Sequence, residues 1–193
     1  MYIKYLNLRN FRSFTDTSIW FVDETKNDQP SKIVVFIGNN GAGKTAILDA
    51  LKINLSWLVA RINHTNANGI HISDMDIQNG ETYADISLKL KFQDEFYQWR
   101  LAKTLRGSSK ITYSNLGEAN HLATMLQNQL SLDVKNAALP MIVYYPCERT
   151  VVEIPLKIKT HHSFGQLDGY DNALKQGADF RRFFECRAGI EAQ

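Results

Sequence analysis

One short segment of the sequence has the residue types and spacing of a phosphate-binding loop. It is composed of Gly38, Asn39, Asn40, Gly41, Ala42, Gly43, Lys44 and Thr45. Glycines let the backbone curl with its N–H groups pointing inward, where side chains would block a polyphosphate. The lysine ammonium can reach the β- and γ-phosphates, and the threonine hydroxyl can complete the coordination of Mg²⁺. The segment, with the adjoining Ala46, therefore predicts a site for ATP in which Thr45 is the Mg²⁺ ligand.

The elements expected on either side of this loop are those that position it. Ile33–Ile37 is a short apolar run rich in β-branched residues, typical of a strand buried on both faces of a parallel sheet. After the loop, apolar residues recur at helical spacing and predict a helix from residue 43 to about 61. A helix that begins at the loop directs its positive end at the phosphates. A glycine turn with an incidental lysine is the less favoured interpretation.

Alternating patterns predict an antiparallel sheet beside this core. Residues 1–22 carry β-formers and predict two strands joined around residues 11–16. Strict alternation over residues 82–92 continues in residues 96–105, and the short polar connection between them suits a hairpin. Residues 111–113 are expected to add a third strand.

Further elements follow along the chain. An amphipathic helix is expected around residues 122–130, a buried strand at 141–145, and a last helix over 171–185. Together these elements predict an α/β P-loop NTPase fold of the ABC-ATPase type, with a mixed sheet and an antiparallel β-subdomain.

Composition and charge narrow the class of protein. The chain has 193 residues of which 44% are hydrophobic, enough for one domain with a core. Lys and Arg total 22 against 20 Asp and Glu, so only a local basic face could bind nucleic acid.

Tyr97 and Trp99 could stack on bases, but their alternation favours core packing. Cys147 and Cys186 lack zinc-ligand spacing, and no apolar run suits a membrane span or signal peptide, so we expect a cytoplasmic protein without a membrane partner.

A second segment connects the glycine loop with a known family. The opening Leu8-Arg9-Asn10-Phe11-Arg12-Ser13-Phe14, followed by the glycine loop, resembles ABC-type ATPases of the RecF, SMC and OLD-like group. The resemblance implies an antiparallel amino-terminal sheet beside the nucleotide, with Arg12 and Ser13 joining the nucleotide site. From the residues alone, Phe11 and Phe14 in the core and a solvated Arg12 would be an equally good interpretation.

Glu148 and Arg149 are candidate sensors of the nucleotide. They follow the strand predicted at residues 141–145, where such ATPases place the residue that senses Mg²⁺ and the γ-phosphate. Many ABC proteins have glutamine there. A surface ion pair between the two neighbours is the alternative, because such pairs are common and contribute little.

Three short segments resemble the ATPase subunits of anti-phage systems, namely Septu PtuA and its retron-associated relatives. They are residues 73–77, 146–149 and 178–185. The resemblance implies a homodimer or higher homo-oligomer that works with an HNH nuclease, in some systems alongside a reverse transcriptase and its noncoding RNA–DNA product. The alternatives are a RecF- or SMC-type repair or chromosome-maintenance ATPase that contacts DNA, and a catalytically inert nucleotide sensor.

The groups that hydrolyse ATP in such families are not evident in this sequence. Hydrolysis needs an apolar strand ending in Asp-Glu and a Ser-Gly-Gly-like signature, and Asp94-Glu95 falls in a predicted hairpin turn. We therefore expect residues 1–193 to form a single, incomplete amino-terminal lobe that binds ATP but does not hydrolyse it alone. No residue is assigned as catalytic.

Overall fold

Two compact units make up the chain, Met1–Ala138 and Leu139–Gln193. The computed structural model describes residues 1–23, 29–109, 111–132, 139–145, 151–153, 166–170, 173–174 and 178–179. The glycine loop and the segment around Arg12 both belong to the first unit.

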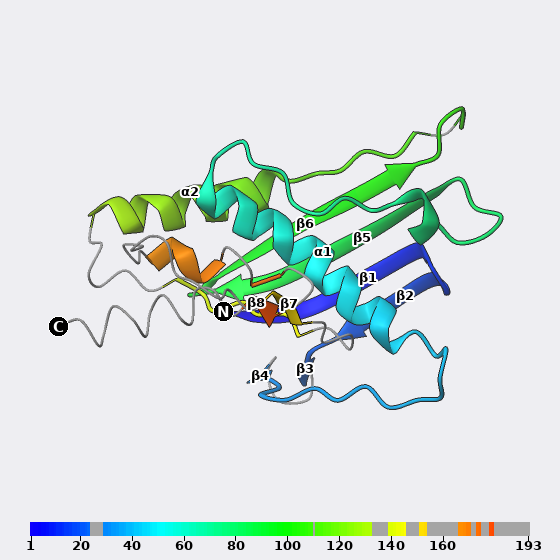
Figure 1. The fold of residues 1–193 in the computed structure, drawn as a ribbon, viewed down its shortest axis with the longest axis horizontal. Coiled ribbons are helices and arrows are strands. Elements are labelled where there is room, and N and C mark those ends of the chain that lie inside the picture. Colours follow the sequence, from blue (N-terminus) through cyan, green and yellow to red (C-terminus); the bar gives the residue numbers. More distant parts are fainter. Residues whose placement is uncertain are drawn as a thin grey trace. The chain divides into compact units, whose positions relative to one another are not determined.

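The first unit is built on a four-stranded antiparallel sheet with the strand order β2-β1-β5-β6 (Figure 1). One hairpin consists of β1 (Tyr2–Phe11) and β2 (Phe14–Trp20), and a second consists of β5 (Tyr83–Phe92) and β6 (Glu95–Thr104). Pairing of β1 with β5 joins the two hairpins. Successive side chains of a strand point to opposite faces, and β1, β5 and β6 each contribute one buried, largely apolar face. Both predicted hairpins are confirmed.

Two helices, α1 (Lys44–Asn63) and α2 (Gly117–Leu132), cover one face of this sheet (Figure 1). Both were expected, although α2 is longer than its apolar pattern indicated. The hydrophobic core lies between the helices and the sheet. Its buried side chains include Leu6, Leu8, Ile86, Leu88, Leu90, Tyr97, Trp99, Leu101, Ala50, Ile53, Leu58, Leu122 and Leu126. The expected core positions of Tyr97 and Trp99, which are 3% and 1% exposed, are thus confirmed.

A short 3₁₀ turn, η2 (Asp74–Asp76), is attached to the connection between β1 and β2. Phe11 and Ile77 form an isolated antiparallel bridge, and the backbone N–H of Arg12 donates to the carbonyl of Asp76 at 2.7 Å. These backbone contacts bring residues that are far apart in sequence to the same end of the sheet.

Two further short strands, β3 (Val22–Asp23) and β4 (Gln29–Pro30), pair antiparallel.

Ile33–Ile37 is irregular, so the parallel core predicted around it is wrong. Ile33, Val35 and Ile37 are 82%, 70% and 93% exposed. A strand needs neighbours that pair with its N–H and C=O groups. None of the strands in the described part of the chain pairs with this segment. Apolar β-branched composition favours a buried strand, but it does not supply the neighbouring strand.

Residues 111–113 run beside β6 without forming the predicted third strand. Asn115 exchanges both backbone hydrogen bonds with Arg100, at 2.9 and 2.7 Å. At the next position the backbone N–H of Ala102 donates instead to the hydroxyl of Ser114, at 2.9 Å. Because a side chain replaces the backbone partner, the ladder does not continue.

The second unit contains a short parallel pair of strands, β7 (Val151–Glu153) and β8 (Ala178–Asp179), and a 3₁₀ turn over Gln166–Tyr170. The helix predicted over residues 171–185 is wrong where the structure describes it, because pairing with β7 holds Ala178–Asp179 extended. Most of that predicted helix lies outside the described residues.

Residues 141–145 are also irregular, which contradicts the predicted buried strand. Met141 and Tyr145 are 90% and 81% exposed, whereas Ile142 is 6% exposed. Ile142 is therefore the one buried apolar side chain among residues 141–145, and the backbone N–H of Tyr144 pairs with the Ala173 carbonyl at 2.8 Å instead of with a strand. Among the described helices of the whole chain, none is long and apolar enough to cross a membrane.

Candidate nucleotide-binding site

The glycine loop leads directly into α1, and two of its glycines have left-handed backbone conformations. The φ angles of Gly41 and Gly43 are +84° and +87°. Residues with side chains rarely adopt this region. At Gly43 the space is also occupied, because a Cβ atom there would lie 2.6 Å from Cζ of Phe14. Gly43 is therefore required both by backbone conformation and by packing, whereas Gly41 is required by conformation alone.

The start of α1 offers an environment suited to an anion. Gly43 is the N-cap and has no side chain to accept a hydrogen bond from the first turn, which also contains no acidic residue. The N–H groups of a first helical turn have no partner within the helix, and they form the positive end of the helix dipole. Helix starts of this kind bind phosphate groups.

Lys44 folds back over the loop that precedes it. Its Nζ atom donates to the carbonyl oxygens of Gly38 and Asn39, at 2.8 and 2.7 Å. The ammonium thus holds the beginning of the loop near the start of α1. A phosphate that enters the loop would take over at least one of these hydrogen bonds, which places the lysine where it can pair with the β- and γ-phosphates.

The remaining residues of the predicted site contribute in different ways. Asn40 and Thr45 are exposed, so the threonine hydroxyl is accessible to a metal ion. The N–H of Ala42 donates to the carbonyl of Asn39 at 3.2 Å and closes the turn. Ala46 is 6% exposed and packs in the core, so only its backbone can face a ligand. The left-handed glycines, the open helix start, the lysine and the threonine together fit the polyphosphate of ATP with Mg²⁺.

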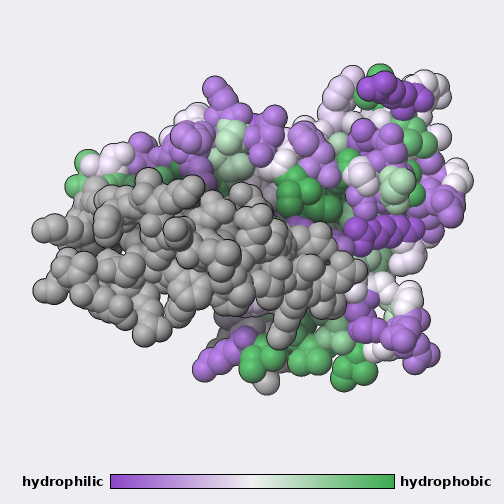
Figure 2. Space-filling model, viewed as in Figure 1, coloured by the Kyte–Doolittle hydropathy of each residue, from purple (hydrophilic) through white to green (hydrophobic). Residues whose placement is uncertain are grey.

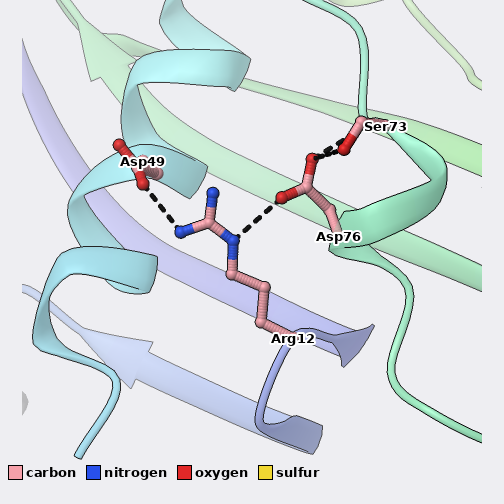
Figure 3. A network of polar contacts seen from close by, with 4 residues as sticks. All are labelled: Arg12, Asp49, Ser73 and Asp76. Carbon is pink, nitrogen blue, oxygen red and sulfur yellow. Dashed lines mark hydrogen bonds and ion pairs between the residues drawn. The ribbon is translucent and has the colours of Figure 1, made fainter. Parts of the chain in front are cut away.

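Arg12 lies between two carboxylates, as Figure 3 shows. Its Nη1 donates to Oδ2 of Asp49 on α1 at 2.7 Å, and its Nε donates to Oδ1 of Asp76 at 2.8 Å. The other oxygen of Asp76 accepts from both the hydroxyl and the N–H of Ser73, at 2.7 and 2.9 Å. The guanidinium therefore connects the β1–β2 turn, α1 and η2.

Ser13 and Phe14, the two residues that follow Arg12, lie against the glycine loop. A Cβ atom on Gly43 would be 3.2 Å from Oγ of Ser13 and 2.6 Å from Phe14. The structure therefore brings together the two segments on which the family resemblance rests. Contact of Arg12 and Ser13 with a nucleotide stays a prediction.

Comparison with known proteins decides the family. Residues 5–188 match the profile of the family described as AAA domain, which is nearly the whole chain. The chain belongs to the AAA domain family.

Curated relatives of this AAA-domain chain include ATPases of two kinds. The Retron Ec83 probable ATPase of Escherichia coli is 27% identical over 185 residues, which cover 93% of this chain and 33% of the relative. The Retron Vc95 probable ATPase of Vibrio cholerae is 28% identical over 200 residues, covering 98% and 37%. The DNA double-strand break repair Rad50 ATPase of Thermoplasma volcanium is 30% identical over 141 residues, covering 72% and 14%.

The comparisons confirm the resemblance to ABC-type ATPases of the RecF and SMC group and to retron-associated ATPases. They also confirm the α/β P-loop NTPase fold class. The AAA-domain chain spans about a third of the length of the two retron relatives.

The pKa values of Arg12 and Asp76 are both shifted in this cluster. Burial opposes the charge of Arg12 and lowers its pKa, but the hydrogen bonds to Asp49 and Asp76 outweigh this and raise it above the usual value. Burial likewise raises the pKa of Asp76, while Ser73 and then Arg12 bring it below the usual value. Arg12 and Asp76 are therefore both charged near neutral pH.

Asp49, Ser73, Asp76 and Phe14 were not among the residues predicted for the site. Residues 73–77 contributed to the family resemblance, but no role was assigned to them. A Ser followed three residues later by an acidic residue is the signal of a capping box, and the structure has one at Ser73 and Asp76. The pairing of Asp49 with Arg12 depends on packing across 37 residues of sequence and has no local signal. Glu148 and Arg149, the candidate sensors, lie outside the described residues.

Proposed function

We propose that this chain is the ATP-binding part of an ATPase subunit in a bacterial anti-phage defence complex. The observation that supports it best is the glycine loop at the open start of α1, packed against the β1–β2 turn through Gly43 and Phe14. In this proposal the polyphosphate lies in the loop, Lys44 pairs with the β- and γ-phosphates, and Thr45 coordinates Mg²⁺. The two retron probable ATPases among the relatives support the defence role.

The complex we propose is a cytoplasmic homodimer or higher homo-oligomer that acts with an HNH nuclease. A reverse transcriptase with its noncoding RNA–DNA product is a further partner, in keeping with the word retron in the names of the relatives. In cells that carry the complete gene and its neighbours, phage plating should fall, and Lys44→Ala should restore it. If phage plate equally well on cells with and without the genes, the defence role is contradicted. ATP binding is tested separately, by calorimetry.

We further propose that residues 1–193 bind ATP but do not hydrolyse it by themselves. The chain corresponds to about a third of its retron relatives, and the segment Ile33–Ile37, which has the composition of a buried strand, is irregular and exposed. Phosphate release by the purified chain should therefore equal that of the buffer. If the wild type releases phosphate and Lys44→Ala does not, this proposal is contradicted. If both release phosphate equally, the activity comes from a contaminating ATPase.

A DNA-repair or chromosome-maintenance ATPase is the second candidate, because relatives named Rad50, RecF and Smc also match the chain. An HNH nuclease that copurifies with the full-length protein would favour defence. Activity on DNA ends without such a partner would favour repair.

ATP binding is tested by titration calorimetry with and without Mg²⁺. We expect heat of binding from the wild type, stronger with Mg²⁺, and at least a tenfold loss of affinity in Lys44→Ala. The variant should stay folded, because the ammonium of Lys44 donates to carbonyls of its own loop. Lys52→Ala, on the same helix, is the matched control and should bind as the wild type does. A folded wild type that produces no heat would overturn the proposal.

A further inference from the structure

The two edges of the four-stranded sheet differ in what lies along them. At the β6 edge, Asn115 exchanges backbone hydrogen bonds with Arg100. Next to it, the Ser114 hydroxyl accepts from the N–H of Ala102 at 2.9 Å and donates to the carbonyl of the same residue at 3.3 Å. The opposite edge is β2 (Figure 1). Within the described residues, β1 is the one strand that pairs with β2, and its outer edge has no backbone partner.

Alternate backbone groups of β2 therefore point away from the sheet. In an antiparallel ladder, successive residues direct their N–H and C=O groups to opposite sides of the strand. Four side chains of β2 are exposed as well, those of Thr15, Asp16, Ser18 and Trp20. Water can satisfy the backbone groups, but an added strand satisfies them and also covers the side chains beside them.

The devices that keep an edge strand from pairing with another chain are missing from β2. Such devices are lysines, prolines, bulges and very short strands. β2 has seven residues, without Lys or Pro, and it pairs with β1 in one unbroken register from Trp20 to Phe14. Its charged residue, Asp16, is already paired with Arg9 at 3.2 Å. This edge is therefore open to a further strand.

The order of residues in β2 is nearly the same in both directions. An aromatic residue stands at each end, a β-branched residue follows inside each end, and a polar residue stands on each side of a central threonine. The sequence is Phe14-Thr15-Asp16-Thr17-Ser18-Ile19-Trp20. Two antiparallel copies of such a strand place residues of the same class opposite each other.

Complete overlap of two copies puts each side chain opposite a suitable partner. Thr17 lies opposite the partner's Thr17, and Asp16 lies opposite the partner's Ser18, whose hydroxyl can donate to the carboxylate. Trp20, which is 48% exposed, lies opposite the partner's Phe14. Aromatic pairs and polar pairs across strands both stabilise a sheet. A register that put Asp16 opposite the partner's Asp16 would oppose like charges, so charge and overlap favour the same register.

We propose that β2 joins two copies of this chain edge to edge, antiparallel, about a two-fold axis at Thr17. Two four-stranded sheets then continue as one sheet of eight strands. Because the axis is perpendicular to the sheet, α1 and α2 of both copies cover the same face. The interface is isologous, as in most homodimers. It rests on the homo-oligomer proposed above for its role, but it requires neither ATP nor the glycine loop.

The charge at position 18 tests both the interface and its register. Sedimentation velocity of the full chain without nucleotide, over a range of concentrations, should show a reversible dimer. Ser18→Asp places a second carboxylate opposite the partner's Asp16 at two symmetric positions and should weaken the dimer by about twofold to thirtyfold. Ser18→Lys places an ammonium there and should strengthen it by a similar factor. Ser87→Asp and Ser87→Lys, on the central strand β5, are the matched controls and should leave association unchanged.

Disulfide cross-linking tests the position of the two-fold axis. In a chain with Cys147→Ser and Cys186→Ser, Thr17→Cys brings two thiols directly opposite each other, close enough to form a disulfide between copies. Ser18→Cys places each thiol opposite the partner's Asp16 and should cross-link much less. The extent of cross-linking is measured by electrophoresis without reductant after mild oxidation.

Failure of this proposal is distinguishable from failure of ATP binding. Lys44→Ala, which should lose ATP affinity, should dimerise as the wild type does. The proposal is overturned if folded wild type stays monomeric up to its solubility limit, or if Ser18→Asp and Ser18→Lys do not shift association in opposite directions. It is also overturned if Ser18→Cys cross-links as readily as Thr17→Cys.

Discussion

The guanidinium Nη1 of Arg12, in the turn between β1 and β2, lies 2.7 Å from the carboxylate Oδ2 of Asp49 on α1. A second carboxylate, that of Asp76, accepts from Nε of the same arginine at 2.8 Å. One side chain therefore links the amino-terminal hairpin to the helix that follows the glycine loop and to η2. The ion pairs of Arg12 hold the β1–β2 turn, and this turn holds Phe14 against Gly43. The position of Phe14 in turn restricts the shape of the glycine loop.

Arg12→Ala is expected to destabilise the protein. It removes the guanidinium from two largely buried carboxylates, those of Asp49 and Asp76, whose side chains are 20% and 12% exposed. We expect the free energy of unfolding to fall by about 1–2 kcal/mol in urea denaturation, less than for a fully buried pair because solvent screens Arg12. Arg9→Ala, which removes an exposed pair with Asp16, is the control and should change stability by less than about 0.5 kcal/mol. Equal effects of the two variants would contradict this role of Arg12.

Alanine at Gly43 and at Gly41 should have unequal effects. Both glycines have φ near +85°, so either substitution adds backbone strain of about 1–2 kcal/mol. Only at Gly43 would the new Cβ also clash with Phe14, at 2.6 Å, whereas nothing lies within 4 Å at Gly41. Gly43→Ala should therefore lower both stability and ATP affinity more than Gly41→Ala does. Adding Phe14→Leu to Gly43→Ala should recover part of the stability, and no recovery would indicate that the clash is relieved in another way.

Stability should fall in acid through Asp76. Although burial raises its pKa, Ser73 and Arg12 bring the pKa of the folded state below the usual value. A carboxyl with a depressed folded pKa stabilises the protein above its unfolded pKa of about 3.9, and this contribution is lost as pH falls through the folded pKa. The free energy of unfolding, measured between pH 7 and pH 3, should therefore decline below about pH 4. Asp76→Asn should be less stable than wild type at pH 7 and should show a shallower decline.

Asp85 should have the opposite pH dependence. It is 3% exposed, and burial raises its pKa even though Arg9 and Arg100 act in the other direction. Because the folded pKa is raised, the folded state binds a proton more readily than the unfolded chain, so this group favours folding as pH falls through the folded pKa. Asp85→Asn should thus increase the free energy of unfolding at pH 7, by on the order of 0.5–1 kcal/mol. A loss of stability would show that the two arginines outweigh burial.

The parts of the fold that the sequence predicted correctly depend on local patterns. Alternation predicted β5 and β6, because a pleated strand turns successive side chains to opposite faces. Helical spacing of apolar residues predicted α1, and the glycines, lysine and threonine identified the loop before it. Each of these signals is contained within a few neighbouring residues.

Strand pairing could not be predicted in the same way. Ile33–Ile37 has the composition of a buried strand, yet it is exposed and irregular, because a strand is completed only by backbone partners from elsewhere in the chain. The strand predicted at residues 111–113 does not form for a related reason. Beside it, the hydroxyl of Ser114 takes the place of a backbone acceptor for the N–H of Ala102.

The sequence by itself determined the chemistry of the glycine loop, because glycine conformations and a lysine beside a helix start are properties of adjacent residues. Only the tertiary structure decided what surrounds that loop. The partners of Arg12 come from positions 37 and 64 residues further along the chain, and their meeting depends on how α1 and η2 pack at the end of the sheet. The same packing decides that Trp20 and Phe96 face solvent while Trp99 faces the core, because the face to which a strand residue belongs is set by the register of the whole sheet.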